Sequence, residues 1–310
     1  MIMSLNDNYS KYMTQEEFNN QNHAINSEMK GIGVSVAMRS NKVNITDVVK
    51  NSPAWSCGIK KGDIVLKIDD KEVNYIQNAV QFIQNNDGII KLELLRNGKK
   101  LTKNVQKKLI KLDTLNYELL KDNIGYIRLS SFVCDDTKYE FKLALSKLQN
   151  TKALILDLRG NSGGLLDNAL EISSLFLPYG DIVNVISQDG SKCTYCSNGE
   201  HCMYTNPVVI LVDGLCASAS EGQSGALKDN NRAILIGTKT FGKGLIQKVY
   251  YFKDDNNNVI AGMNLTIAKY LTPNGFDINK KGLEPDYVIK PSKVYDNQLA
   301  YAKKYIKSLK

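Results

Sequence analysis

Three short, almost wholly apolar segments in the second half of the chain most strongly limit what it can fold into. They are Ala153-Leu-Ile-Leu-Asp-Leu, Val208-Val-Ile-Leu-Val-Asp and Ala233-Ile-Leu-Ile-Gly. Segments of this length and composition predict buried strands. Amphipathic patterns between them predict helices over 135–148, over 165–176 and from about 219 onward, and further strands are expected at 124–129, 246–252 and 262–270. Strands that alternate with helices predict an α/β core.

The length and composition are those of an ordinary globular protein. The 310 residues allow two domains, and 43% hydrophobic with 23% charged residues excludes collagen-like, disordered and disulfide-stapled classes. No apolar run approaches the ~18–20 residues of a membrane-spanning helix, and the polar start lacks a secretory signal pattern. The net charge of +8 comes from scattered lysine pairs, which predicts a solvated surface and no nucleic-acid partner.

Before the α/β part, residues 30–107 have the pattern of a small domain of strands and two short helices. Strand-like runs occur at 31–37, 43–49, 63–68 and 89–95, and helices are expected at 52–58 and 76–85. Residues 1–29 are polar, and Thr14-Gln15-Glu16-Glu17 is typical of a capping box that opens a short helix. We therefore divide the chain into an N-terminal helical piece (1–29), the small domain (30–107), a core (108–291) and a basic C-terminal helix (292–310).

The small domain resembles a PDZ domain of the bacterial type. The resemblance rests on the loop Gly31, Ile32, Gly33 and Val34 and on Ser52-Pro-Ala…Gly58-Ile-Lys…Gly62-Asp63, with the helix near 76–85 as the second wall of a groove. Such a module adds a peptide as an extra strand and holds its C-terminal carboxylate on backbone N–H groups. We expect Gly31–Val34 to bind the tail of a peptide.

The inventory of titratable residues limits the chemistry of the core. His23 and His201 are the only histidines, and their surroundings make a Ser-His-Asp triad improbable, so a serine nucleophile needs another base. Segment 215–221 is rich in small residues and opens a helix, where orphan N–H groups can stabilise an oxyanion. Lys243 lies between glycines and apolar residues, and partial burial would lower its pKa and suit it to act as a base.

Gly237-Thr-Lys-Thr-Phe-Gly-Lys-Gly244 nearly matches a phosphate-binding loop. Gly244 replaces the hydroxyl residue that would bind magnesium, and the following Leu245-Ile-Gln-Lys-Val-Tyr has the composition of a strand where a helix should begin. The sequence therefore argues against nucleotide binding.

Five blocks in the second half of the chain together resemble the carboxyl-terminal processing peptidases, also called tail-specific proteases. They are Asp157-Leu-Arg-Gly-Asn-Ser-Gly-Gly164, Cys216-Ala-Ser-Ala-Ser-Glu221, Thr240-Phe-Gly-Lys-Gly244…Gln247, Leu265-Thr-Ile-Ala-Lys-Tyr-Leu-Thr-Pro-Asn-Gly275 and Lys281-Gly-Leu-Glu-Pro-Asp286. The resemblance implies an α/β (α+β) protease core with a mixed sheet and flanking helices beside the PDZ domain.

The resemblance also implies a role for each matching residue. Ser218 would be the nucleophile, Lys243 its general base and Gln247 the residue that orients Lys243. The oxyanion hole would use the amide of Ala219 and that of Gly163 or Gly164. Glu221 and Thr240 fall at supporting positions. Ser220 is the rival nucleophile if the helix begins at a different residue.

The same resemblance provides the expected partners and location. They are protein or peptide substrates with apolar C-terminal tails, with an activator protein and a homodimer as further candidates. It implies an extracytoplasmic site in the cell envelope, although the visible sequence carries no export signal. Movement of the PDZ domain about a hinge near 106–113 would gate the activity. Cys216, Ser162 and Phe276 depart from the family pattern without removing a catalytic role.

One cluster lies outside the resemblance. Cys193, Cys196, His201 and Cys202 offer four zinc-type ligands within ten residues, although the spacing is irregular for zinc. We expect no cofactor and regard zinc as the weaker alternative to free thiols. The sequence thus predicts a serine endopeptidase with a Ser-Lys dyad, and its alternative is an inactive or latent PDZ scaffold that binds peptides.

Overall fold

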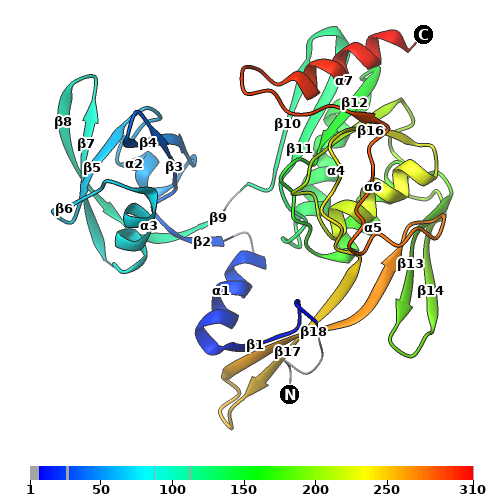
Figure 1. The fold of residues 1–310 in the computed structure, drawn as a ribbon, viewed down its shortest axis with the longest axis horizontal. Coiled ribbons are helices and arrows are strands. Elements are labelled where there is room, and N and C mark those ends of the chain that lie inside the picture. The colour runs from blue at the N-terminus through cyan, green and yellow to red at the C-terminus, as the bar shows by residue number, and fades with distance from the viewer. Residues whose placement is uncertain (1–6, 26–27, 87, 112, 310) are drawn as a thin grey trace. The chain divides into compact units, whose positions relative to one another are not determined.

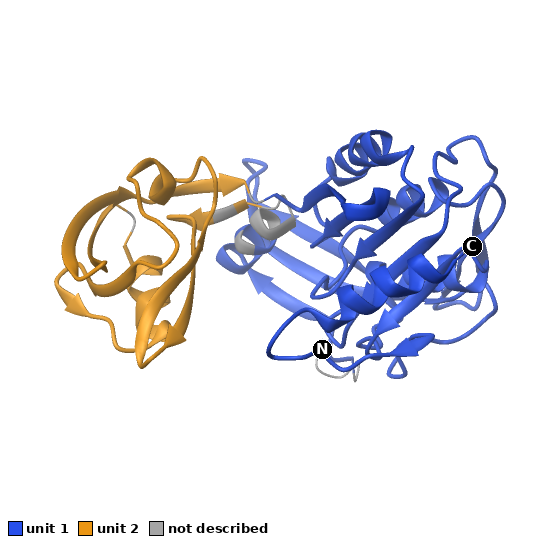
Figure 2. Cartoon of the chain, turned by 90° about the horizontal axis from the view of Figure 1, so that it is seen from above, with its two compact units in different colours: residues 1–26, 113–310 blue, residues 27–112 orange. Residues whose placement is uncertain are grey.

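The computed structural model describes residues 7–25, 28–86, 88–111 and 113–309. The chain forms two compact units, one of residues 1–26 with 113–310 and the other of residues 27–112 (Figures 1 and 2). No helix among the described residues is long and apolar enough to cross a membrane. We call residues 27–112 the PDZ unit and the remainder the core unit.

The core unit contains a six-stranded sheet in the order β10-β11-β12-β15-β16-β19. The strands are β10 (Leu115–Leu120), β11 (Ile124–Leu129), β12 (Ala153–Asp157), β15 (Val208–Val212), β16 (Ala233–Gly237) and β19 (Tyr287–Val288). All neighbours pair in parallel except β10, which runs antiparallel to β11. The α/β core expected from the sequence is confirmed.

Both faces of this sheet are covered, which explains why its central strands are apolar apart from Asp157 at the end of β12. The covering helices are α4 (Thr137–Leu148), α5 (Leu166–Ser174), α6 (Ala219–Asp229) and α7 (Asn297–Ser308), and a turn η2 (Lys121–Asn123) precedes β11. Leu154 and Ile210 pack in one cluster with residues of α4, α5 and α6. Ile155 and Val209 point the other way and pack with Ala302 of α7. Alternate residues of one strand therefore serve two hydrophobic cores.

A second sheet of the core unit has the order β1-β18-β13-β14, with β17 also paired to β18. Its strands are β1 (Lys11–Thr14), β13 (Gly180–Ser187), β14 (Lys192–Ser197), β17 (Leu245–Lys253) and β18 (Val259–Leu271), and α1 (Gln15–Ile25) follows β1. The capping box is present, because Thr14 N–H donates to Glu17 and Glu17 N–H donates to Thr14 Oγ1. Met13 lies opposite Gly262, so the N-terminal piece is part of the core unit.

The PDZ unit has its own sheet in the order β3-β4-β5-β7-β8, with β6 paired to β5. Its elements are β2 (Glu28–Gly31), β3 (Val34–Arg39), β4 (Lys42–Val48), α2 (Pro53–Ser56), β5 (Ile64–Ile68), β6 (Lys71–Glu72), α3 (Ile76–Gln84), β7 (Ile89–Arg96), β8 (Lys99–Gln106) and β9 (Lys108–Lys111). A separate core that includes Ile45, Ile90 and Leu92 holds it together.

The segment expected to act as a hinge is largely ordered strand. Residues 108–111 form β9, which pairs antiparallel with β2, so this ribbon belongs to the PDZ unit, and the movement expected about it stays a prediction. The division between the units therefore falls at 112, several residues after the boundary placed from the sequence. Polar composition suggested a loop at 106–113, but pairing with β2 satisfies the backbone groups of β9.

Candidate active site

The predicted catalytic residues gather where β12, β15 and β16 end. These strands are parallel, so the segments that follow them (158–164, 213–218 and 238–244) leave the same edge of the sheet. In open α/β sheets this edge commonly carries the functional site. The structure thus brings together three of the sequence blocks.

Ser218 is the N-cap of α6 and has an unusual backbone conformation, with φ 58° and ψ −122°. A non-glycine residue is strained there, and such strain concentrates at functional sites. The Ser218 side chain is partly exposed, whereas Ser220 is fully buried inside α6. Ser218 is therefore accessible to a peptide and Ser220 is not, which argues against Ser220 as the rival nucleophile.

Glu221 forms hydrogen bonds with both the turn that contains Ser218 and the loop that contains Lys243. Its buried carboxylate accepts the N–H of Ser218 at 2.9 Å, of Gly242 at 2.7 Å and of Lys243 at 2.8 Å. Thr240 Oγ1 donates to the same carboxylate at 2.5 Å and accepts the N–H of Leu283 at 2.7 Å. Four donors suit an ionised carboxylate, which can only accept hydrogen bonds.

Lys243 lies in the partly buried environment that the sequence suggested. Burial lowers the pKa of its amine, and the negative charge of Asp7 opposes that effect only in part. Its Nζ donates to Gln247 Oε1, on β17, at 2.7 Å. Among the described residues, no hydrogen bond joins Lys243 Nζ to Ser218 Oγ. The structure therefore places Gln247 beside Lys243 and leaves the Ser218–Lys243 pair unbonded.

Two tyrosines complete these surroundings, and the sequence reasoning gave neither of them a role. The hydroxyl of Tyr270 lies within hydrogen-bond distance of the carbonyl oxygens of Ser218 (2.7 Å) and Lys243 (2.8 Å). Burial raises the pKa of Tyr270 well above its ordinary value. The ring centroid of Tyr9 is 4.8 Å from Lys243 Nζ. Tyr270 falls inside the block Leu265–Gly275, but only the tertiary structure shows what the two tyrosines contact.

The expected oxyanion residues lie around Ser218, with one distinction between the glycines. A Cβ on Gly163 would lie 2.9 Å from that of Ser218, so this glycine packs directly against Ser218. The N–H of Gly163 donates to Asn161 Oδ1 at 2.8 Å. In the part of the chain that the structure describes, the N–H groups of Ala219 and Gly164 have no acceptor. Gly164 therefore suits the oxyanion role better than Gly163.

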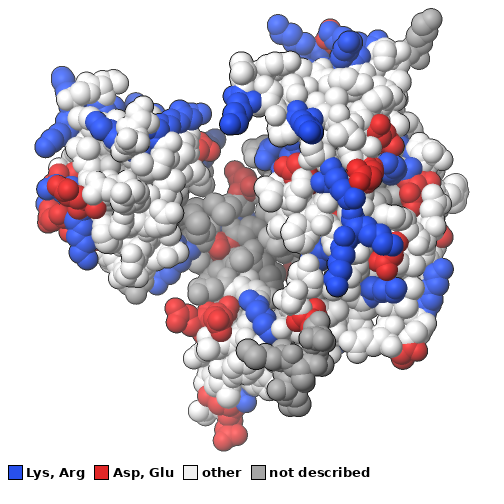
Figure 3. All heavy atoms as spheres, in the orientation of Figure 1, with Lys and Arg blue, Asp and Glu red and all other residues white. Residues whose placement is uncertain are grey.

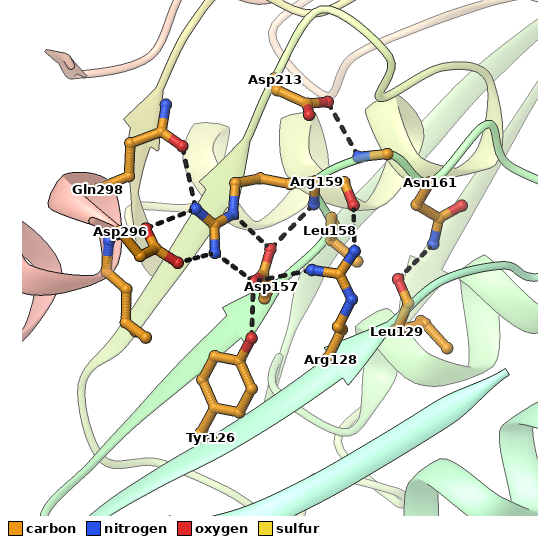
Figure 4. Close-up of polar contacts among 12 residues, drawn as sticks. Tyr126, Arg128, Leu129, Asp157, Leu158, Arg159, Asn161, Asp213, Asp296 and Gln298 are labelled. Carbon is orange, nitrogen blue, oxygen red and sulfur yellow. Dashed lines mark hydrogen bonds and ion pairs between the residues drawn. The ribbon is translucent and has the colours of Figure 1, made fainter. Parts of the chain in front are cut away.

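A buried ionic network anchors the loop that carries these glycines (Figure 4). Asp157, at the end of β12, accepts the hydroxyl of Tyr126 at 2.7 Å and a guanidinium N–H of Arg159 at 2.6 Å. Arg159 also donates to Asp296, the N-cap of α7, at 2.8 Å. Burial raises the pKa of Tyr126 to about 12. The network links the glycine loop to the C-terminal helix.

The PDZ unit presents the expected loop beside a free sheet edge. Gly33 has a left-handed φ of 81°, and a Cβ there would lie 2.3 Å from that of Ser52. The carbonyl of Ile32 accepts the N–H of Ala54 at 2.9 Å, which fixes the loop against α2. Strand β3 begins at Val34. Among the residues that the structure describes it pairs only with β4, so its other edge is open next to α3.

The zinc alternative has no support in the geometry. Cys193 and Cys196 are exposed on β14, and their separation of three places them on opposite faces of the strand. Within the described ranges, no three His, Cys, Asp or Glu side chains are placed to hold a metal ion. The structure therefore does not bring Cys193, Cys196, His201 and Cys202 together as a ligand set. Segment 237–244 is followed by β17, as the composition of 245–250 predicted.

Comparisons with known proteins agree with this architecture. The description "Peptidase family S41" matches residues 123–289, and "PDZ domain" matches residues 31–106. The carboxy-terminal processing protease CtpA of Bacillus subtilis is 37% identical, over 92% of this chain and 61% of its own length. A carboxyl-terminal-processing protease of Synechocystis is 34% identical, over 93% of this chain and 69% of its own length.

Solved protease structures have a similar fold. The photosystem II D1 C-terminal processing protease superposes with a TM-score of 0.58 and 26% identity, covering 93% of this chain and 79% of its own. An S41 protease structure from Bacteroides fragilis has a TM-score of 0.71 at 16% identity, covering 99% and 88%, and shows a shared fold. The chain spans 61% and 58% of the lengths of two CtpA-type relatives, from Bacillus subtilis and Staphylococcus haemolyticus.

Proposed function

Because the chain belongs to peptidase family S41, we propose that it is a serine endopeptidase with a Ser218–Lys243 dyad. The observation that supports this proposal is the set of hydrogen bonds that the Glu221 carboxylate accepts, which we call the Glu221 frame. One buried carboxylate accepts the backbone N–H groups of both residues and thereby fixes the turn of Ser218 relative to the loop of Lys243. A nucleophile and a base on two loops need such a frame to hold a productive geometry.

The chemistry follows from the surroundings of each side chain. Neutral Lys243 takes the proton of Ser218 Oγ while the oxygen attacks the peptide carbonyl carbon, and the ammonium then returns that proton to the leaving amine. The N–H groups of Ala219 and Gly164 stabilise the oxyanion, assisted by the N-terminus of α6. Water, deprotonated by the same lysine, releases the acyl group. Gln247 holds Lys243 Nζ in place.

The PDZ unit supplies tail recognition in this proposal. A C-terminal peptide adds to the free edge of β3, and its carboxylate is bound by N–H groups of the loop Gly31–Val34. The unit holds 16 Lys and Arg against 8 Asp and Glu, whereas the core unit holds 24 of each. In Figure 3 blue side chains lie along the upper and lower margins of its visible face, beside one red cluster. We therefore infer that apolar tails preceded by acidic residues are preferred.

Cleavage of an unstructured protein with an apolar C-terminal tail tests the proposal. We expect Ser218→Ala and Lys243→Ala to abolish cleavage. Ser220→Ala and Lys248→Ala, which change a buried serine and an exposed lysine near the same loops, are expected to keep it. Cleavage that persists in Ser218→Ala would refute the dyad. Tail binding by a wild-type protein that cleaves nothing would favour the alternative of a PDZ scaffold or a latent enzyme that awaits an activator.

A further inference from the structure

Tyr9 reaches the site from a segment more than 200 residues earlier in the chain. Its ring centroid is 4.8 Å from Lys243 Nζ, and its backbone oxygen accepts Gln247 Nε2 at 2.7 Å. We propose that Tyr9 is a positioning residue for Lys243, acting through its ring on the amine and through its carbonyl on Gln247. The inference rests on the proposed function, because it assigns Tyr9 to the base of the same dyad.

Tyr9 is held in place by contacts that do not involve its ring. Asp7 Oδ1 accepts the N–H of Tyr9 at 3.1 Å, and Asp7 Oδ2 accepts the hydroxyl of Ser10 at 2.5 Å. Ser10 Oγ in turn accepts the N–H of Thr266, on β18, at 3.0 Å. Strand β1 begins at Lys11, directly afterwards, and pairs with β18. The turn 7–10 is therefore anchored to the core unit, and a change of the ring leaves that anchor intact.

The carbonyl of Tyr9 decides which end of the Gln247 amide faces the lysine. A glutamine amide has one end that donates and one that accepts. Because Nε2 donates to the Tyr9 oxygen, Oε1 is turned toward Lys243 Nζ and accepts from it at 2.7 Å. With the amide reversed, Nε2 would face the amine and could not accept its proton. An N-terminal backbone group thus sets the orientation of Gln247.

The ring acts on the charge that appears during the reaction. Lys243 is neutral before it takes the proton of Ser218 and positive afterwards, and the face of an aromatic ring attracts a nearby cation. The ring therefore stabilises the protonated state more than the neutral one, which favours the transition state over the ground state. The charged groups near Lys243 are Asp7 on this segment and Glu221 on α6, which accepts the lysine's backbone N–H.

Three substitutions at Tyr9 separate the effect of the ring from that of apolar volume. We expect Tyr9→Phe to keep kcat within about twofold, because the ring face is retained. Tyr9→Leu and Tyr9→Ala should each lower kcat about tenfold with KM unchanged. Tyr12→Leu is the matched control, since Tyr12 lies on neighbouring β1, is 57% exposed and has no ring contact with Lys243. Thermal unfolding of each variant checks that the fold is retained.

The outcomes separate this inference from the proposed function. If Ser218→Ala and Lys243→Ala are inactive while Tyr9→Leu cleaves as fast as the wild type, the dyad stands and the role of Tyr9 is overturned. A loss at Tyr9→Leu confined to KM would also overturn it. If Ser218→Ala still cleaves, the proposed function itself fails, whatever Tyr9 does.

Discussion

The carboxylate of Glu221 accepts the backbone N–H of Lys243 at 2.8 Å, and through the same oxygen it accepts the N–H of Ser218. One side chain on α6 therefore fixes two loops that leave different strands of the sheet. Tyr270, on β18, also connects these two loops, because its hydroxyl lies within hydrogen-bond distance of the carbonyl oxygens of Ser218 and Lys243. The backbone around Ser218 and Lys243 is held by buried side chains on two different elements.

Replacement of this carboxylate should impair catalysis more than binding. Glu221→Gln puts an amide NH₂ group where all four partners donate, so at least one donor is left without an acceptor. We expect a loss of about 1–3 kcal/mol in the free energy of unfolding and a fall in kcat. Glu284→Gln, an exposed residue paired with Lys239, is the control. A Glu221→Gln enzyme with wild-type kcat would show that the frame is unnecessary.

The pH dependence of cleavage should follow Lys243. A base must be neutral, so the rate is expected to rise with pH through a pKa below the ordinary lysine value of 10.5. The charge of Asp7 raises this pKa, so Asp7→Asn should move the rise to lower pH. Rates measured across pH 6–10 check both expectations, with Asp255→Asn at the tip of the β17–β18 hairpin as control. A rise at higher pH in Asp7→Asn would contradict the assignment.

Gly163 leaves no room for a side chain. Its φ is +100°, and a Cβ would lie 2.7 Å from the carbonyl oxygen of Ala217 and 2.9 Å from the Ser218 Cβ. Gly163→Ala should therefore displace Ser218 and abolish cleavage. Gly160→Ala is the matched control, because Gly160 also has a positive φ, +77°, but open space around it. Equal activity in the two variants would show that contact with Ser218 is irrelevant.

The Asp157 network should contribute to stability. Asp157 is fully buried and Arg159 is 15% exposed, so Asp157→Ala leaves a largely desolvated guanidinium with only its bonds to α7. We expect a loss of about 3 kcal/mol in the free energy of unfolding, measured by denaturant titration. Asp70→Ala breaks the exposed pair with Lys91 and should change little. A stable Asp157→Ala protein would mean that Asp296 and Gln298 are sufficient partners for Arg159.

The positive charge of the PDZ unit should make tail binding sensitive to salt. Exposed charges are screened over about 8–10 Å at physiological ionic strength. A tail peptide with acidic residues before an apolar C-terminus should bind more weakly as salt rises, whereas a neutral peptide with the same terminus should not. Fluorescence anisotropy of labelled peptides measures this, and amidation of the C-terminus should weaken both. Equal salt dependence of the two peptides would contradict a preference for acidic tails.

Local patterns were enough to predict much of the fold. The apolar segments 153–158 and 208–213 form β12 and β15, and the composition after Gly244 predicted β17. These predictions succeed because a few adjacent residues are enough to indicate burial and strand preference. Strand β14 was not predicted, since all its residues except Ser197 are exposed and its pairing with β13 makes it a strand. Most of the polar join at 106–113 likewise became a strand, β9, through its pairing with β2.

The same difference between local patterns and contacts of distant residues applies to the candidate site. The amino-acid sequence indicates which residues are available for chemistry: a serine that opens a helix, a lysine among apolar neighbours, and too few histidines for a triad. The tertiary structure alone decided that Ser220 is buried and that Gly163 N–H is occupied. It also decided that Tyr9 covers Lys243. These facts depend on contacts between residues far apart in the chain, and such contacts exist only once the sheets are assembled.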